Sequence, residues 1–198
     1  MRLGVGSTGT TEDAGLATRL AWMTALRLGF LTLLLAAVAF FYLKGALLQY
    51  GASMRIVFVT IAAAYGLAAA YAALLRTGKN LRRLAMAQLV LDQIVWTAIV
   101  YVSGGATSGA TSFYALEGLV GAILIGLPGA ATAAIAGVTV YAGMCLAFAL
   151  RWVLPPSDQG PAAYVVTLSE LVYPLLVNAL GISVVALLAG YLAERLRV

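Results

Sequence analysis

The sequence predicts an all-α, polytopic membrane protein: a bundle of six transmembrane helices with both termini in the cytoplasm. Hydrophobic residues make up 63% of the 198 residues and charged residues 10%, and the mean hydropathy is +1.01. A soluble domain is about half apolar and about a quarter charged, so this composition indicates a membrane protein. Two patterns agree with it. The apolar residues form runs long enough to cross a bilayer, and the basic residues flank these runs.

The apolar runs define the expected spans, since a transmembrane helix needs about 20 predominantly apolar residues. We expect spans at about 25–43, 56–75, 84–103, 111–127, 129–150 and 171–192. The fourth is the shortest, and Pro128-Gly129 joins it to the fifth in a tight turn. Residues 1–24 are expected to form a cytoplasmic lead-in that is disordered over residues 1–15 and then amphipathic with helical spacing. Residues 193–198 are expected to be the start of a cytoplasmic helix.

The basic residues predict the orientation. With the N-terminus inside, the outer flanks hold only Lys44, Arg55 and Arg151 of the twelve basic residues. The inner flanks hold the others, which are Arg2, Arg19, Arg27, Arg76, Lys79, Arg82, Arg83, Arg195 and Arg197. Cytoplasmic loops carry an excess of Lys and Arg. We therefore expect the chain to span a bacterial inner membrane with both termini in the cytoplasm.

Composition also excludes several classes of function. The net charge of +5 is spread over span ends instead of forming a basic stripe, which argues against nucleic-acid binding. The chain has no histidine, so histidine ligands, general bases and phosphoacceptors are absent from it, and the single Cys145 cannot form a disulfide framework. No nucleophile with an adjacent base, zinc motif or phosphate loop is present. We therefore expect this chain to be no enzyme and to hold no metal or other cofactor.

Polar residues gather between the third and fourth spans. Placing a charge at the centre of a bilayer costs roughly 2.5–3.5 kcal/mol on insertion scales, so such residues usually face protein or water and often mark function. Asp92 lies near the expected midplane, and Glu117 lies closer to the outer surface, which argues against a carboxylate pair sharing one proton or metal. The candidates for sensing a signal or binding a ligand are Gln88, Asp92, Gln93, Ser103, Gly104, Gly105, Ser108 and Glu117.

Three interpretations of these polar residues remain open: packing between helices, sensing of a ligand or partner, and a path for protons or ions. The turn at residues 104–112 has two adjacent glycines, no charge and several hydroxyl groups. We expect it to change conformation easily and to be where the stimulus acts. We expect the Asp92 carboxyl to be neutral or hydrogen-bonded.

Two further features concern helix packing and output. Small residues are spaced four apart at Ala62, Gly66 and Ala70 in the second span and at Gly129, Ala133 and Gly137 in the fifth. They are expected to pack inside one bundle, and a dedicated dimer face is the alternative. The sixth span contains Pro174 and Asn178, which are candidates for signal relay. It ends in AGYLAERLRV without a Gly or Pro stop, so a cytoplasmic domain is expected to follow.

The third span and its turn resemble a known family. The order and spacing of Gln88, Leu89, Asp92, Ser103, Gly104, Gly105 and Ser108 resemble the six-span membrane sensor region of PilS-type and NtrB-like sensor histidine kinases. The resemblance implies a homodimer, a downstream kinase that phosphorylates a response regulator, and pilin or another membrane-embedded helix as a ligand. It also implies a PAS-like linker, a phosphoacceptor histidine and an ATP-binding domain, none of which lies in this chain.

The motif departs from its relatives in one place. Gly109 and Ala110 stand where many relatives have a proline and a bulky residue, and the Asn-Pro-Phe associated with quinone in RegB-type kinases is missing. We therefore expect a sensory membrane domain, without a quinone, that acts on its kinase through the sixth span. The alternatives are a small solute-binding membrane subunit or transporter, and a purely structural or assembly protein.

Overall fold

The fold is built from α-helices joined by short connections. A computed structural model describes residues 8–160, 164 and 167–196, and the side chains from residue 15 onwards. Within this part there is no strand, which confirms the predicted all-α class. The helices are α1 (Thr8–Leu43), α2 (Gly51–Arg76), α3 (Leu81–Val102), the short 3₁₀ helices η1 (Gly105–Thr107) and η2 (Gly109–Thr111), α4 (Ser112–Ile125), α5 (Leu127–Ala149) and α6 (Leu168–Arg195).

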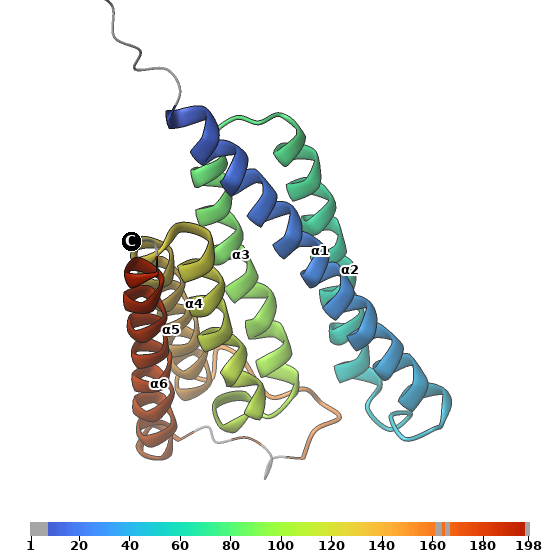
Figure 1. Ribbon diagram of the computed structural model, residues 1–198. Coiled ribbons are helices and arrows are strands. Elements are labelled where there is room, and N and C mark those ends of the chain that lie inside the picture. Colours follow the sequence, from blue (N-terminus) through green and yellow to red (C-terminus); the bar gives the residue numbers. More distant parts are fainter. Residues whose placement is uncertain (1–7, 161–163, 165–166, 197–198) are drawn as a thin grey trace, which may run out of the picture.

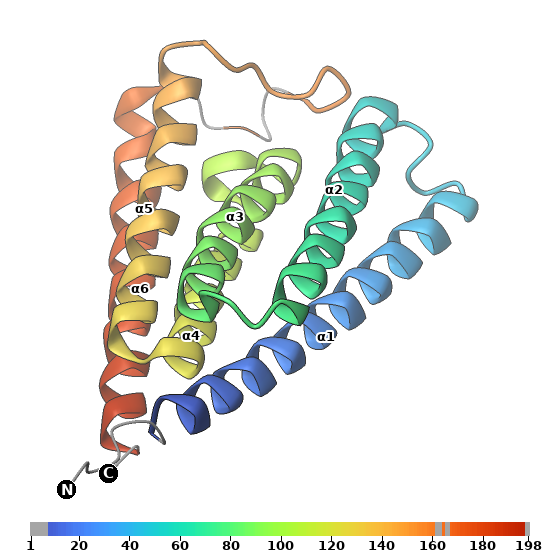
Figure 2. The same ribbon diagram turned by 90° about the horizontal axis from the view of Figure 1, so that it is seen from above.

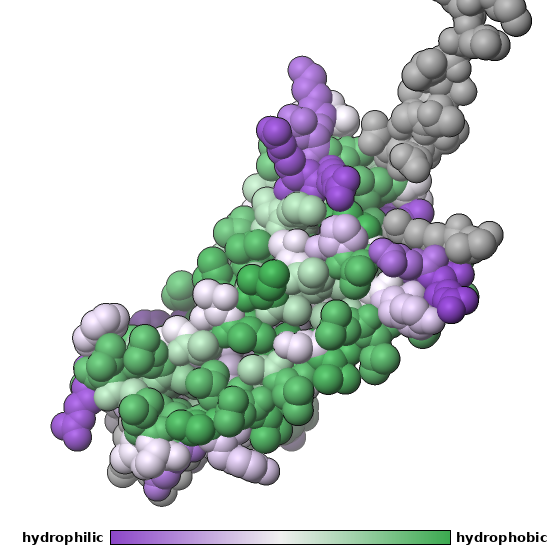
Figure 3. Space-filling view, turned by 90° about the vertical axis from the view of Figure 1, so that its left-hand side faces the viewer, coloured by the Kyte–Doolittle hydropathy of each residue, from purple (hydrophilic) through white to green (hydrophobic). Residues whose placement is uncertain are grey.

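Five of these helices are long and apolar enough to cross a membrane: α2, α3, α5, α6 and the Gly15–Leu43 part of α1. The predicted fourth span corresponds to α4, which has 14 residues; together with η2 it makes a shorter apolar helix over Gly109–Ile125. Figure 3 shows hydrophobic side chains over most of one face, with hydrophilic side chains gathered towards its ends. This surface and these helices indicate a multi-pass membrane protein.

The helices run alternately up and down. Figure 1 and Figure 2 place the start of α1, the α2–α3 loop, the α4–α5 junction and the end of α6 at one end of the molecule. The α1–α2 loop, the 3₁₀ turns and the α5–α6 loop lie at the opposite end. Helices α3 and α4 lie in the middle, with the α1–α2 hairpin on one side and α5–α6 on the other.

Small residues bring α4, α5 and α6 close together. The α4–α5 reversal takes one residue, Gly126, at a φ of 81° that favours glycine. The backbones of Gly121 and Gly129 meet directly across this hairpin, and a Cβ on either would overlap the other's carbonyl. Gly118 packs against Ala186 of α6, where an added Cβ would lie 3.1 Å from the Ala186 Cβ. Helix backbones approach closely in membranes in this way.

The two stripes of small residues have different surroundings. In α5 the residues Gly129, Ala133 and Gly137 are buried inside the bundle, as predicted. In α2 the residues Ala62, Gly66 and Ala70 are exposed, and a Cβ on Gly66 would meet nothing within 4 Å. The prediction of packing inside one bundle is therefore wrong for α2, because that helix uses its opposite face, with Ala64, Ala68 and Tyr71, for contacts.

The predicted lead-in is also corrected. Helix α1 begins at Thr8 and continues without a break for 36 residues, so residues 8–15 are helical instead of disordered, and the helical spacing of residues 16–24 is confirmed. The physical reason is packing: Leu20 is fully buried in a cluster with Leu81, Ala85 and Leu89 of α3, which stabilises helix well before the predicted span. Residues 1–7 of the lead-in and residues 197–198 of the predicted exit helix lie outside the described part of the chain.

Candidate functional site

The site is organised by an arginine inside a membrane-length helix. Because the apolar part of α1 extends over Gly15–Leu43, Arg27 lies within this helix and not at its inner flank. Its side chain is 12% exposed and forms an ion pair with Asp92 of α3, whose side chain is 6% exposed. Arg27 also lies over the ring of Tyr71 in α2, 5.6 Å from the ring centroid. One side chain thus connects α1, α2 and α3.

Asp92 was expected to be neutral or hydrogen-bonded, and the structure gives its carboxyl group the Arg27 guanidinium as a partner. The carboxylate has a cationic partner, and it is held by charge as well as by burial. Moving charges out of water is expensive, and their mutual attraction offsets this only when the geometry is close. The pair is the only ion pair between side chains in the described part of the chain. It is a buried polar contact between the least buried membrane-length helix, α1, and the most buried one, α3.

The second carboxylate, Glu117 of α4, faces the same region. Its Oε1 accepts a hydrogen bond of 3.0 Å from Trp96 Nε1 of α3, one helical turn beyond Asp92. Its Oε2 is buried and has no hydrogen-bond partner among the described residues, and the same is true of Arg27 Nη1. Arg27 of α1 therefore lies near both carboxylates, Asp92 of α3 and Glu117 of α4. The two carboxylates belong to one polar cluster, although they were expected at different depths.

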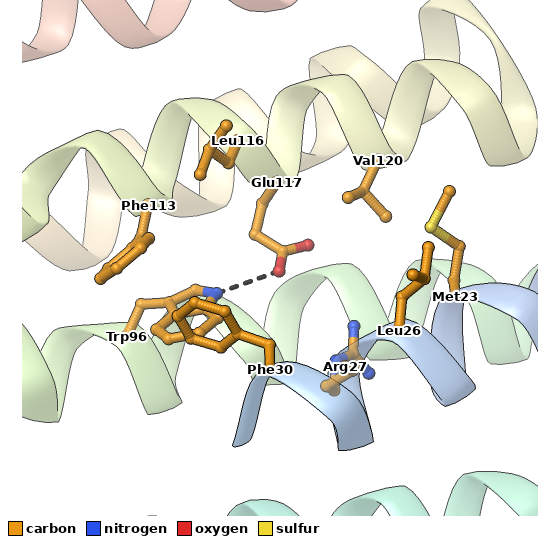
Figure 4. A pocket seen from close by; sticks show the side chains of 9 residues that line it. All are labelled: Met23, Leu26, Arg27, Phe30, Trp96, Phe113, Leu116, Glu117 and Val120. Carbon is orange, nitrogen blue, oxygen red and sulfur yellow. Dashed lines mark hydrogen bonds between the residues drawn. The ribbon is translucent and has the colours of Figure 1, made fainter. Parts of the chain in front are cut away.

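A cavity of about 220 Å³ opens beside these groups, between α1, α3 and α4. Figure 4 shows Glu117 and Arg27 facing it from opposite sides, with aromatic rings beside them. The Trp96 and Phe113 rings stack with centroids 4.6 Å apart, and Phe30 meets both edge-on at 5.6 and 5.7 Å. The lining residues are Met23, Leu26, Arg27, Phe30, Trp96, Phe113, Leu116, Glu117 and Val120.

The two glutamines of α3 lie beside this cluster. Gln88 is 2% exposed, one turn before Asp92. Gln93 is fully buried, and its Nε2 donates to the Ala133 carbonyl of α5 at 2.9 Å and to the Tyr114 carbonyl of α4 at 3.4 Å. Gly137 of α5 leaves room for it, since a Cβ there would lie 3.0 Å from Gln93 Nε2. Gln93 joins three helices and does not line the cavity.

The predicted signalling turn is folded onto the bundle. Ser103 Oγ and Ser108 Oγ share a hydrogen bond of 2.6 Å, and Ser108 Oγ accepts from Ala110 N at 3.0 Å. Gly104 and Gly105 have φ angles of 120° and 62°, and Gly105 is buried where a Cβ would lie 3.1 Å from Phe148 and Tyr164. Most of the hydroxyl groups of this turn thus bond within it or to the adjacent end of α3.

A chain of hydrogen bonds joins this turn to α6. Tyr141 of α5 donates its hydroxyl to the Ala106 carbonyl of η1 at 2.7 Å, and Asn178 Nδ2 of α6 donates to the Tyr141 oxygen at 3.2 Å. Asn178 Nδ2 also donates to the Pro174 carbonyl at 2.8 Å. Tyr141 therefore connects Asn178, and through it Pro174, with the turn, and no hydrogen bond links either residue to the charged cluster among the described residues.

Comparison of the chain with protein-family models, with curated proteins and with solved structures gives no match. The site must therefore be judged from its own chemistry. Within the described residues no three His, Cys, Asp or Glu side chains are grouped so that they could hold a metal ion. What the arrangement offers is one unpaired buried donor and one unpaired buried acceptor at the end of an aromatic cavity.

The sequence indicated half of this site. Asp92 and Glu117 were recognised because carboxylates are conspicuous in apolar helices, whereas Arg27, Trp96 and Tyr71 were missed. A signal for Arg27 exists: the apolar run Leu16–Leu43 is longer than one span requires, so an arginine within it falls inside the helix. The aromatic wall of the cavity gives no comparable signal, because single aromatic residues occur throughout these helices.

Proposed function

We propose that this chain is the sensory membrane domain of a two-component histidine kinase. In this proposal it spans a bacterial inner membrane six times with both termini in the cytoplasm, forms a homodimer, and relays its signal through α6. The observation that carries the proposal is the buried Arg27–Asp92 ion pair beside the unpaired Glu117 Oε2. Ionisable groups inside a membrane bundle are rare and usually serve a function.

The ion pair suits a switch between two arrangements of α1. Removing one partner of a buried pair leaves an uncompensated charge and is strongly destabilising, so any event that separates the two side chains changes the position of α1 markedly. A stimulus that offers Arg27 another acceptor, or Glu117 a donor, competes directly with the existing contacts. The equilibrium between the two arrangements of α1 then depends on the charges of Arg27, Asp92 and Glu117.

Two contacts connect this place with α6. Glu117 faces the cluster on one side of α4, and the next residue, Gly118, packs against Ala186 of α6 on another side. A movement of α4 that follows Glu117 therefore moves the contact point on α6. The second connection is the hydrogen-bond chain from Ala106 through Tyr141 to Asn178. Pilin or another membrane-embedded helix, as the sequence resemblance implies, has the lipid-facing sides of α1 and α4 available as a route to the cluster.

The proposal is tested by measuring autophosphorylation of the full-length protein in nanodiscs. Asp92→Asn and Arg27→Gln should both shift the basal phosphorylation rate, and should shift it in the same direction, because each breaks the same ion pair. Arg19→Gln is the matched control, since Arg19 is exposed on the same helix and makes only a 3.4 Å contact to the Ile123 carbonyl. Unchanged rates in both pair variants, with normal insertion, would contradict a sensory role of the cluster.

A solute-binding membrane subunit or transporter is the second candidate, and the cavity at the cluster favours it. A carrier must expose its site alternately to the two sides of the membrane, whereas a sensor has no such requirement. A cysteine at Leu116, which lines the cavity, distinguishes them in the otherwise Cys145→Ala chain. Labelling by a membrane-impermeant maleimide that switches from one side to the other when solute is added would support a carrier.

A further inference from the structure

Two residues that line the cavity, Glu117 and Arg27, have an unpaired hydrogen-bond acceptor and an unpaired donor, respectively. Glu117 is 5% exposed, its Oε1 accepts a hydrogen bond from Trp96, and its Oε2 is buried without a donor. Arg27 Nη1 is buried without an acceptor, while its Nη2 pairs with Asp92. Both residues line the cavity (Figure 4). Buried polar atoms without partners are rare, and a pair of them lining one cavity points to a missing ligand group.

The remaining walls are apolar and mainly aromatic. Phe30, Trp96 and Phe113 form one continuous set of ring contacts. Their mixture of stacked and edge-on arrangements is the geometry in which a further aromatic ring packs well. The cavity volume of about 220 Å³ exceeds the roughly 150 Å³ of an apolar protein cavity that holds benzene. A single substituted ring therefore fits.

We propose that this cavity binds a small, neutral, amphipathic molecule consisting of one aromatic ring that carries a hydroxyl or carboxamide group. The ring lies against Phe30, Trp96 and Phe113, and the polar group accepts a hydrogen bond from Arg27 Nη1 and donates one to Glu117 Oε2. Such a molecule is the stimulus, or one of the stimuli, of the sensory domain. This last statement rests on the proposed function, whereas binding itself does not.

Hydrogen bonding favours a neutral ligand over an ionic one. Glu117 and Arg27 stand on opposite sides of the cavity (Figure 4). An ammonium group only donates, so it could pair with Glu117 but would leave Arg27 Nη1 without an acceptor, and a carboxylate only accepts, so it would leave Glu117 Oε2 without a donor. A purely apolar ring would leave both polar atoms unpaired. A hydroxyl or carboxamide satisfies both at once because it has a donor and an acceptor.

The route of entry also fits a molecule that dissolves in lipid. Leu26 of α1 and Leu116 of α4 stand at the edge of the cavity and are 58% and 49% exposed on the outer surface of the bundle. In a membrane these surfaces face lipid tails. A neutral aromatic alcohol or amide partitions into the bilayer and reaches the cavity sideways, without crossing the loops.

Trp96 provides a direct test, because a bromine atom in contact with tryptophan quenches its fluorescence. The full chain carrying Trp22→Phe and Trp152→Phe reports from Trp96 alone, and the chain carrying Trp96→Phe and Trp152→Phe reports from Trp22, which is 66% exposed and senses only partitioning into lipid. The probes are 4-bromobenzyl alcohol, 4-bromotoluene, 4-bromobenzylammonium and 4-bromobenzoate, each added to zwitterionic nanodiscs.

We expect 4-bromobenzyl alcohol to quench Trp96 saturably, at a concentration about tenfold lower than 4-bromotoluene when each is normalised to its quenching of Trp22. Glu117→Met should remove this tenfold preference. Val120→Phe should reduce quenching by the alcohol by filling the cavity without touching the polar groups, and Leu119→Phe, on the exposed side of α4, should not.

Each other outcome overturns the proposal. Equal quenching by the alcohol and the toluene means that the polar end selects nothing, and stronger quenching by the ammonium or the benzoate means an ionic site. Absence of saturable quenching by any probe means that the cavity holds water or lipid only. The proposed function fails separately: if the alcohol binds at Trp96 but leaves autophosphorylation of the full-length protein unchanged, the ligand site stands and its sensory role is lost.

Discussion

At the scale of single residues, some buried polar groups have hydrogen-bond partners within the fold, whereas others have none. Ser103 and Ser108 were candidates for sensing, yet their hydroxyl groups bond to each other within the turn. Gln93 bonds to α4 and α5 through its Nε2, although its Oε1 has no partner. Glu117 keeps one oxygen unpaired, and Arg27 keeps one nitrogen unpaired. The sequence distinguishes these cases poorly, because a polar residue in an apolar helix looks the same whether its partner is a backbone carbonyl or nothing.

Gly105 provides a prediction at this scale. Gly105→Val should lower the free energy of unfolding by about 1–3 kcal/mol, because its φ of 62° disfavours a side chain and its space is filled by Phe148 and Tyr164. Gly109→Val is the control, since a Cβ there meets nothing within 4 Å. Denaturant titration in mixed micelles measures both. Equal stability of the two variants would contradict the tight packing of the turn.

Asp158, in the α5–α6 loop, gives a prediction about pH. Partial burial alone would raise the pKa of this carboxyl, but hydrogen bonds from the Ser53 hydroxyl and backbone outweigh it and hold the pKa below its usual value. A carboxylate with a depressed pKa contributes stability that is present above its unfolded pKa of about 3.9 and is lost as pH falls through the lower folded value.

The contact between Asp158 and the start of α2 should therefore persist at neutral pH and loosen below about pH 4. Fluorescence transfer between labels on the α5–α6 loop and α2 measures it. Asp158→Asn should loosen the contact at neutral pH and remove the change below pH 4. A wild-type contact that weakens instead near pH 7 would contradict the assignment to Asp158.

At the scale of helices, the sequence predicts most positions well and their faces less well. The spans near 56–75, 84–103 and 129–150 lie inside α2, α3 and α5 or within a residue of their ends, because uninterrupted apolar runs end at polar residues or at Gly and Pro. The start of α1 was missed because packing by Leu20 stabilises it, which composition does not reveal. The outward face of Gly66 was missed for a related reason: spacing alone cannot tell which of two faces meets a neighbour.

Tyr141 provides the prediction for the elements. Tyr141→Phe removes the bridge between Ala106 and Asn178, so unfolding should become easier by about 1–2 kcal/mol. In a double-mutant cycle, Asn178→Leu should add little once Tyr141 is replaced. Tyr173→Phe, at an exposed position of α6, is the control and should change nothing. Fully additive effects of Tyr141→Phe and Asn178→Leu would show that the two side chains act independently.

At the scale of the whole molecule, we expect the proposed homodimer to form through the outward stripe of Ala62, Gly66 and Ala70. Gly66→Leu should weaken self-association at least several-fold, because a bulky side chain prevents close approach of two α2 helices. Gly143→Leu, at an equally open position of α5, should not. Single-molecule photobleaching in nanodiscs at low protein density counts the subunits. A dimer that tolerates Gly66→Leu would place the interface elsewhere.

The central claim is that the buried Arg27–Asp92 pair couples α1 to the rest of the bundle. A double-mutant cycle with Arg27→Met and Asp92→Leu, followed by denaturant unfolding in mixed micelles, tests it most directly. Each single variant leaves a buried charge unpaired and should cost about 3–5 kcal/mol, whereas the double variant should unfold near the wild-type free energy, because both charges are gone. Single effects that simply add in the double variant, to within about 0.5 kcal/mol, would contradict the claim.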